Sequence, residues 1–243
     1  MTKNSENWYS SWFDSPFYHI LYQDRDHNEA QEFMDNLTGF LNLPKNGSIL
    51  DLACGKGRHS IYLNSIGYKV TGVDLSENSI AYAKQFENEN LEFEVHDMCK
   101  PYHKDFDAVF NLFTSFGYFE NEEDNLKTLK AIKANLNTTG FGVIDFMNTD
   151  YVIKNLVTED TKSVGGIDFQ QKRYIENDYI IKDITFKSGN TNYNFQEKVK
   201  ALSYSDFKKL FEAADIRLLE VFGDYKLQKF ESENSERLIM IFK

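Results

Sequence analysis

The stretch Ser48-Ile-Leu-Asp51-Leu-Ala-Cys54-Gly55-Lys-Gly57-Arg58-His59 decides the fold. Ser48–Ala53 is a short apolar run that predicts a strand, and Arg58–Ile66 predicts a helix closed by Gly67. The glycines between them let the backbone turn tightly and approach a ligand closely. The helix start offers unpaired N–H groups and the positive end of a dipole, which suit a carboxylate or a phosphate.

The same alternation continues along the chain after this turn. Further strands are predicted over residues 68–74, 91–96, 106–113 and 141–147. Ser76 is expected to cap the helix that runs to about Glu87, and Asn121 to cap a later helix that Gly140 stops. Strands alternating with helices predict βαβ units and therefore a parallel sheet with right-handed crossovers.

The flanking segments differ from this core. An aromatic-rich start precedes a helix that Asp26 is expected to cap, and its apolar face is predicted to be Ala30, Phe33, Met34, Leu37, Phe40 and Leu41. After Asp150 the alternation ends, and residues 163–202 predict about three antiparallel strands. Ser203 and Asp206 have capping-box spacing before a helix, and two strands follow at residues 217–222 and 237–242.

Composition narrows the class of protein. The chain has 243 residues, 41% of them hydrophobic, and a formal net charge of −11, which makes nucleic acid an unexpected partner. The sequence has no secretory signal or apolar run long enough to span a bilayer. Cys54 and Cys99 have no metal-type spacing, so we expect no metal site, and the cytoplasm is the predicted location.

Two acidic residues follow the next strands. Asp74 ends the second strand, about 20 residues after the glycine turn, where a carboxylate can accept hydrogen bonds from ribose hydroxyls. Asp97 ends the third strand, and with Met98 it could address a base. The carboxyl ends of parallel strands meet at one edge of the sheet, so these groups are expected to share a binding site. A nucleoside-containing cofactor is therefore predicted.

The dinucleotide motif G-x-G-x-x-G is incomplete because Ser60 stands where its third glycine or alanine is expected. No P-loop sequence is present. An NAD-dependent oxidoreductase thus remains an alternative, although the motif does not favour it.

Four segments, residues 49–60, 70–76, 94–99 and 106–119, together resemble class I S-adenosylmethionine-dependent methyltransferases, in particular small bacterial members of unassigned substrate. The resemblance implies an α/β fold with a doubly wound, mostly parallel seven-stranded sheet, Rossmann-like, carrying a small antiparallel β insertion. It also implies S-adenosylmethionine as the cofactor and a small-molecule methyl acceptor as the partner. A protein that holds S-adenosylmethionine without turning it over is the other alternative.

We predict four parts on this basis. Residues 1–47 form an N-terminal helical lid segment, and residues 48–150 form the S-adenosylmethionine-binding core. Residues 151–202 form the antiparallel insertion, which caps the substrate, and residues 203–243 complete the core sheet.

The resemblance also suggests the cofactor contacts. Ala53, Cys54, Gly55 and Gly57 would line the methionine part, whereas Arg58 could pair with the methionine carboxylate or simply with Asp51 or solvent. Asp74 would bind the ribose, with Leu75 against the adenine, and Asn111 and Leu112 would face the methyl sulfonium. The predicted cofactor set is Tyr22 as a lid contact, Asp51, Ala53, Cys54, Gly55, Gly57, Arg58, Asp74, Leu75, Ser76, Asp97, Met98, Asn111 and Leu112.

The acceptor side is less defined by the sequence. Candidate acceptor contacts are Tyr18, His19, Ser115, Phe116, Tyr118 and Arg173. The N-terminal rings could instead form core, and Arg173 could lie on a solvated strand face. No residue stands out as a general base, and His19, His96, Tyr22 and Tyr118 are candidates by position only. The identity of the acceptor and the oligomeric state stay open.

Overall fold

A computed structural model describes residues 12–23, 27–119 and 121–243. The chain divides into two compact units, one formed by His27–Tyr151 with Leu202–Lys243 and the other by Met1–Asp26 with Val152–Ala201. The division at Asp26 falls inside the predicted lid segment of residues 1–47, so the helix that begins at His27 belongs to the larger unit.

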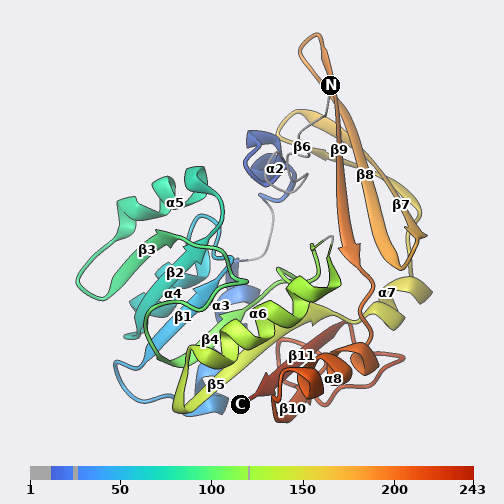
Figure 1. The fold of residues 1–243 in the computed structure, drawn as a ribbon. Coiled ribbons are helices and arrows are strands. Elements are labelled where there is room, and N and C mark those ends of the chain that lie inside the picture. The colour runs from blue at the N-terminus through green and yellow to red at the C-terminus, as the bar shows by residue number, and fades with distance from the viewer. Residues whose placement is uncertain (1–11, 24–26, 120) are drawn as a thin grey trace, which may run out of the picture. The chain divides into compact units, whose positions relative to one another are not determined.

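The larger unit is built on a seven-stranded sheet in the order β10-β11-β5-β4-β1-β2-β3 (Figure 1). Its strands are β1 (Ser48–Leu52), β2 (Lys69–Asp74), β3 (Leu91–Val95), β4 (Phe106–Asn111), β5 (Leu136–Met147), β10 (Leu218–Phe222) and β11 (Arg237–Phe242). The pairs from β3 to β5 are parallel, and β11 pairs antiparallel with both β5 and β10. The predicted doubly wound, mostly parallel sheet with a reversed final strand is confirmed.

Helices cover this sheet, and α6 and α8 lie in front of it in Figure 1. The helices of this unit are α3 (His27–Leu41), α4 (Arg58–Ser65), α5 (Glu77–Ala83) with the 3-10 turn η1 (Lys84–Phe86), α6 (Glu122–Ala134) and α8 (Tyr204–Ala213). The helix α7 (Thr149–Lys154) crosses the boundary between the units. Ser76 caps α5, Asn121 caps α6, and Ser203 with Asp206 forms a capping box on α8, as predicted.

The main core lies between the sheet and helices α3, α4 and α5. It contains fully buried side chains such as Phe33, Leu37, Ile49, Leu63 and Phe110. Burial of such apolar side chains contributes roughly 1.5–3 kcal/mol each. This packing fixes the carboxyl edge of β1, β2 and β4 as a rigid base for the turns that follow them.

The smaller unit is an antiparallel sheet in the order β6-β7-β8-β9, with helix α2 (Pro16–Leu21) packed against it. Its strands are β6 (Glu159–Val164), β7 (Ile167–Glu176), β8 (Tyr179–Ser188) and β9 (Thr191–Lys200). Asn177 and Asp178 both have positive φ, at 51° and 61°, which matches the twist of a two-residue hairpin. Its core contains Trp12, Leu21, Phe169 and Ile184, all with no exposed surface.

The number of strands in this insertion was predicted wrongly, because four are present where about three were expected. Strand β6 begins at Glu159 and is almost wholly exposed, so it lacks the alternation of apolar residues by which a strand is found in sequence. Its strand character comes from pairing with β7.

Two further predictions in the larger unit are corrected. Gly140 does not stop a helix but lies within β5. The helix α6 already ends at Ala134, because the side chain of the next residue, Asn135, bonds the backbone of Tyr102 and Lys104. Phe40 was expected on the buried face of its helix but is 49% exposed, with its ring edge against Phe222. The expected cap Asp26 lies outside the described residues.

Among the helices that the structure describes, none is both long and apolar enough to cross a membrane.

Two glycines test the packing of the larger unit. A Cβ at Gly72 would lie 2.6 Å from the ring of buried Phe93 and 2.8 Å from Ser60 Oγ, whereas a Cβ at Gly39 in α3 would meet nothing within 4 Å. We expect Gly72→Ala to lower the free energy of unfolding by about 1–3 kcal/mol. Gly39→Ala should raise it by about 0.5–1 kcal/mol, because alanine favours the helix. Urea denaturation of both variants measures the two effects, and equal effects would contradict the assigned packing.

Candidate functional site

The turn between β1 and α4 is held in a left-handed backbone conformation. Ala53, Gly55 and Gly57 have φ of 60°, 56° and 82°, and the Cys54 N–H donates to the Val73 carbonyl at 3.0 Å. Gly55 and Gly57 are needed for different reasons. A Cβ at Gly55 would point into open space, which leaves room for a ligand, whereas a Cβ at Gly57 would strike the Phe93 ring at 2.6 Å. Gly57 is therefore required for packing.

Asp74 ties this turn to the end of β2. Its Oδ2 accepts a hydrogen bond from the Gly55 N–H and its Oδ1 one from the Ser76 N–H, each at 2.8 Å. Ser76 itself caps α5 by accepting from the Ser79 N–H at 3.0 Å. A carboxylate has about four lone-pair sites in all, so a ribose hydroxyl could also donate to Asp74. The neighbouring Leu75 is 52% exposed, so its apolar side chain is available to a flat ring.

Asp51 lies beneath the turn with 2% of its surface exposed. Its Oδ2 accepts a 2.6 Å hydrogen bond from the Ser60 hydroxyl. Burial raises the pKa of Asp51 from 3.8 to about 7, and the nearby Asp74 carboxylate adds to this shift. The sequence marked Ser60 only as a missing glycine, and the structure shows that it bonds the buried carboxylate. The only signal in the sequence was a small residue three places after Gly57, and this signal is not specific.

Cys54 is buried in the same turn. Burial raises the pKa of its thiol well above 9.0, and the Asp51 and Asp74 carboxylates raise it further. The thiol therefore stays protonated at neutral pH, which favours a lining role over a nucleophilic one.

Residues after β3 and β4 meet at the same edge. Burial opposes ionisation of Asp97, but hydrogen bonds from the Cys99 backbone and from Lys100 outweigh it and lower its pKa. The Asn111 Nδ2 donates to the Leu52 carbonyl at 3.3 Å and lies 3.8 Å from Met98 Sδ. The predicted residues Met98, after β3, and Asn111, in β4, are thus brought together beside Leu52 at the end of β1.

One buried polar atom at this edge lacks a partner. The Asn111 side chain has no exposed surface, and its Oδ1 accepts no hydrogen bond from the part of the chain that the structure describes. Such an atom costs about 1–3 kcal/mol. A donor group on a bound ligand would remove this cost. With the open space at Gly55, it indicates that the edge fits a polar ligand such as S-adenosylmethionine.

Arg58 and His59 begin α4 beside the loop after β4. The Nη2 of Arg58 lies 2.8 Å from His59 Nε2, and its Cζ lies 5.4 Å from the centroid of the Phe113 ring. The His59 ring stacks on Phe113, with centroids 4.4 Å apart. Arg58 also lowers the pKa of Asp51 through its charge, so both of its predicted roles stay predictions.

The predicted acceptor residues of this unit have unequal exposure. The Ser115 hydroxyl donates to the Leu112 carbonyl at 2.8 Å. Tyr118 is partly buried. Phe116 has no exposed surface and packs against Phe207, with ring centroids 5.5 Å apart. Its burial favours core packing over contact with an acceptor, because the loop turns this side chain inward.

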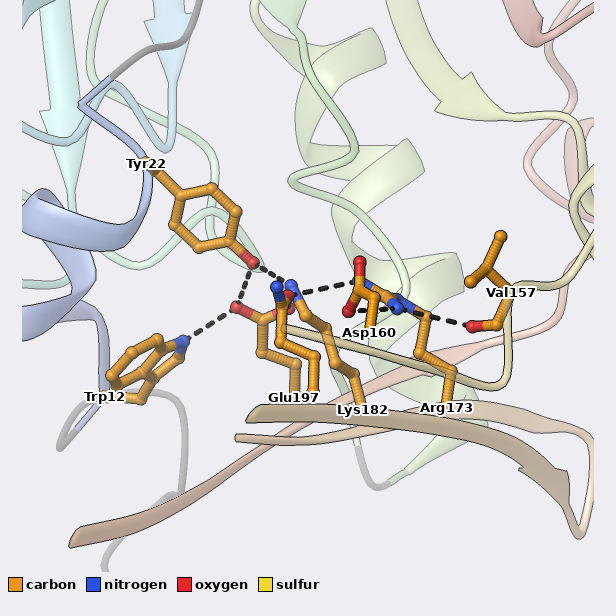
Figure 2. A network of polar contacts seen from close by, with 8 residues as sticks. Trp12, Tyr22, Val157, Asp160, Arg173, Lys182 and Glu197 are labelled. Carbon is orange, nitrogen blue, oxygen red and sulfur yellow. Dashed lines mark hydrogen bonds and ion pairs between the residues drawn. The ribbon is translucent and has the colours of Figure 1, made fainter. Parts of the chain in front are cut away.

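Tyr22, in the smaller unit, belongs to a polar network shown in Figure 2. Its hydroxyl donates to Glu197 Oε1 at 2.6 Å and accepts from Lys182 Nζ at 2.6 Å. The Trp12 Nε1 donates to the same Glu197 oxygen at 2.7 Å. Burial lowers the pKa of Lys182 although Glu197 opposes this shift. The network fastens the N-terminal segment to the insertion sheet.

The remaining predicted residues of this unit are also engaged within it. Arg173 forms an ion pair with Asp160, with Nη1 and Oδ1 3.0 Å apart. Tyr18 packs edge-on against Trp12 at 5.6 Å, and His19 lies 5.4 Å from the Tyr18 ring. Their predicted contacts with a cofactor or an acceptor therefore stay predictions.

Comparison with known proteins agrees with this geometry. Residues 49–140 match a family described as a methyltransferase domain. YqeM of Bacillus subtilis, a methyltransferase by name, is 33% identical over 123 residues, which are 49% of each chain. TehB of Haemophilus influenzae, an S-adenosyl-L-methionine-dependent methyltransferase by name, is 36% identical over 109 residues, 43% of this chain and 37% of TehB. The chain thus spans about half or less of the length of these relatives.

A solved S-adenosylmethionine-dependent methyltransferase from Clostridium acetobutylicum shares the fold, with a TM-score of 0.78 and 21% identity over 93% of this chain and 95% of that one. The resemblance seen in the sequence is therefore confirmed. Residues 49–140 thus match a methyltransferase domain, and the chain has the fold of a solved S-adenosylmethionine-dependent methyltransferase.

The Asp74 carboxylate provides a direct test of the cofactor contacts. We expect Asp74→Asn to weaken binding of S-adenosylhomocysteine at least tenfold, or about 1.4 kcal/mol, because an amide cannot accept two backbone N–H bonds and two ribose hydroxyls equally well. Isothermal titration calorimetry measures the change. Asp107→Asn is the matched control, since Asp107 accepts the Ser48 N–H and hydroxyl at the opposite end of these strands. Unchanged affinity in Asp74→Asn would remove the ribose assignment.

The raised pKa of Asp51 predicts a pH dependence of stability without cofactor. Protonated Asp51 favours the folded state, and this stabilisation is lost as the pH rises from 3.8 through about 7. The free energy of unfolding should therefore fall between pH 5 and 7 by about 2–3 kcal/mol more in the wild type than in Asp51→Asn. Urea denaturation at both pH values gives this difference, and parallel pH profiles would contradict it.

Proposed function

We propose that this protein transfers the methyl group of S-adenosylmethionine to a small-molecule acceptor. The observation that carries the proposal is the meeting of the glycine turn, the Asp74 carboxylate and the unpartnered Asn111 Oδ1 at one sheet edge. The glycine turn supplies space, and the Asp74 carboxylate accepts hydrogen bonds. Asn111 Oδ1 is a buried acceptor to which a ligand could donate. The methyltransferase-domain match over the same segment supports the assignment.

S-adenosylmethionine, when bound, supplies an electrophilic methyl group whose leaving group is a neutral thioether. In the transfer the acceptor atom forms a bond to the methyl carbon while the sulfur–methyl bond breaks. The products are the methylated acceptor, S-adenosylhomocysteine and, for a protonated nucleophile, one proton. Such a displacement depends chiefly on alignment and on removal of water. The stacked Phe113 and His59 rings would help to exclude water in this proposal.

We propose an amine as the acceptor. Glycine N-methyltransferase of Oryctolagus cuniculus is 29% identical over 152 residues, 55% of this chain and 52% of that enzyme. Glycine/sarcosine N-methyltransferase of Parasynechococcus marenigrum is 26% identical over 200 residues, 74% of this chain and 66% of that enzyme. A neutral amine is a sufficient nucleophile, which agrees with the lack of an evident general base. The candidates for a general base, by position only, remain His19, His96, Tyr22 and Tyr118.

The proposal also covers the flanking segments, the cellular location and the partners. The roles predicted for the N-terminal segment as a lid, for the antiparallel insertion as a substrate cap and for Tyr22 as a lid contact belong to this proposal. The cytoplasm is the proposed location, supported by two free cysteines. The net charge of −11 supports small molecules over nucleic acid as partners.

The proposed activity is tested with purified protein, S-adenosylmethionine and a panel of glycine, sarcosine, ethanolamine and catechol. We expect S-adenosylhomocysteine to form with at least one amine, measured by mass spectrometry, and to fall at least tenfold in Asp74→Asn. Cofactor binding without turnover of any acceptor would favour the non-catalytic alternative. Tighter binding of NAD than of S-adenosylhomocysteine would overturn the proposal.

A further inference from the structure

The loop after β4 begins with a strained turn. Phe113 and Thr114 have φ of 56° and 60°, a left-handed conformation that side-chain-bearing residues rarely adopt. Each such residue costs on the order of 1–3 kcal/mol, and it persists only where surrounding contacts determine it. The loop continues through Ser115 and Tyr118, which are candidate acceptor residues.

The contacts that determine this turn come from Asp145, near the end of β5. Its Oδ2 accepts the Phe113 N–H at 2.8 Å, and its main-chain carbonyl accepts the Thr114 N–H at 2.9 Å. Both strained residues are therefore bonded to one buried aspartate, which has no exposed surface.

Arg237, the first residue of β11, completes the arrangement. Its Nε donates to Asp145 Oδ1 at 2.8 Å, and its Nη2 lies 2.7 Å from the same oxygen. The same Nη2 donates to the Thr114 hydroxyl at 3.0 Å. The side chain is 19% exposed and lies over the Tyr225 ring, 5.5 Å from its centroid. The guanidinium thus holds both the aspartate and the loop.

The turn sets the direction of the Phe113 ring. That ring stacks on His59 at 4.4 Å and lies 5.3 Å from Tyr225 and 6.0 Å from Phe33. His59 follows the glycine turn in sequence, so the ring connects the loop after β4 with the cofactor side of the sheet edge.

We propose that Asp145 and Arg237 are positioning residues for methyl transfer, which hold the turn at Phe113 and Thr114 and so place the acceptor loop against the cofactor turn. The role in transfer rests on the proposed function. The holding of the loop does not, because it follows from the bonds alone. The pair acts through the loop and is assigned no contact with a reacting atom.

Three variants test the pair. Arg237→Lys keeps the charge but cannot bond Asp145 and Thr114 together through a planar fork. Asp145→Asn removes the charge that holds Arg237. Thr114→Val removes only the hydroxyl contact and keeps the shape, so it reports on the loop even if the other two fail to fold. Asp107→Asn, at the opposite sheet edge, is the control.

Hydrogen exchange of peptides covering residues 112–119 is the first readout. We expect exchange at least tenfold faster in Arg237→Lys and Asp145→Asn, and at least threefold faster in Thr114→Val, with peptides of β1 and β2 unchanged. Unchanged exchange in residues 112–119, or equal acceleration throughout the sheet, would overturn the proposal. These outcomes are measured without an acceptor, so failure of the proposed activity is recognised separately.

Turnover with the amine found by the acceptor panel is the second readout. A positioning role predicts at least tenfold lower kcat in Arg237→Lys with the KM for S-adenosylmethionine within threefold of wild type. A rise in that KM with unchanged kcat would overturn it. Thr114→Ser should keep the wild-type kcat, because serine retains the hydroxyl that Arg237 bonds.

Discussion

The bond between the Gly55 N–H and the Asp74 carboxylate is the constraint on which the site depends. It joins the turn after β1 to the end of β2, so the loops that follow two neighbouring parallel strands are held together. The same carboxylate bonds the Ser76 N–H and thereby fixes the start of α5. Open space at Gly55 and the exposed Leu75 side chain lie to either side of it. One aspartate therefore holds both turns and is also the residue proposed to bind the ribose.

The sequence was sufficient for features that depend on neighbours along the chain. Glycines at Gly55 and Gly57, the caps at Ser76 and Asn121, and the alternation of strands and helices are local signals, and the structure contains each of them. Features that depend on distant partners were missed. Ser60 was noted only as a departure from a motif, and the strand β6 has no apolar pattern because it stands at a sheet edge. The pairing of Asp145 with Arg237, 92 residues away, leaves no mark in either local sequence.

Both units bond polar side chains beneath the surface, and at the sheet edge of the larger unit one such atom has no partner among the described residues. In the smaller unit, the half-buried Glu197 accepts bonds from Trp12 and Tyr22 and pairs with Lys182, and Arg173 pairs with Asp160 (Figure 2). In the larger unit, Asn111 keeps a buried oxygen without a partner among the described residues. A satisfied network gives a fixed structure, and an unsatisfied atom at a sheet edge is typical of a place where a ligand completes the bonding.

The reversed direction of β11 brings its first residue, Arg237, to the edge at which the parallel strands end. The loop at Thr114 thus depends on a residue that lies 123 positions later in the chain. Chains are synthesised at roughly 5–20 residues per second and fold as they emerge. Strands β1 to β5 can pair before Arg237 exists, but the strained turn cannot be held until that residue arrives. The held conformation of the turn at Phe113 and Thr114 is therefore reachable only after residue 237 has been synthesised.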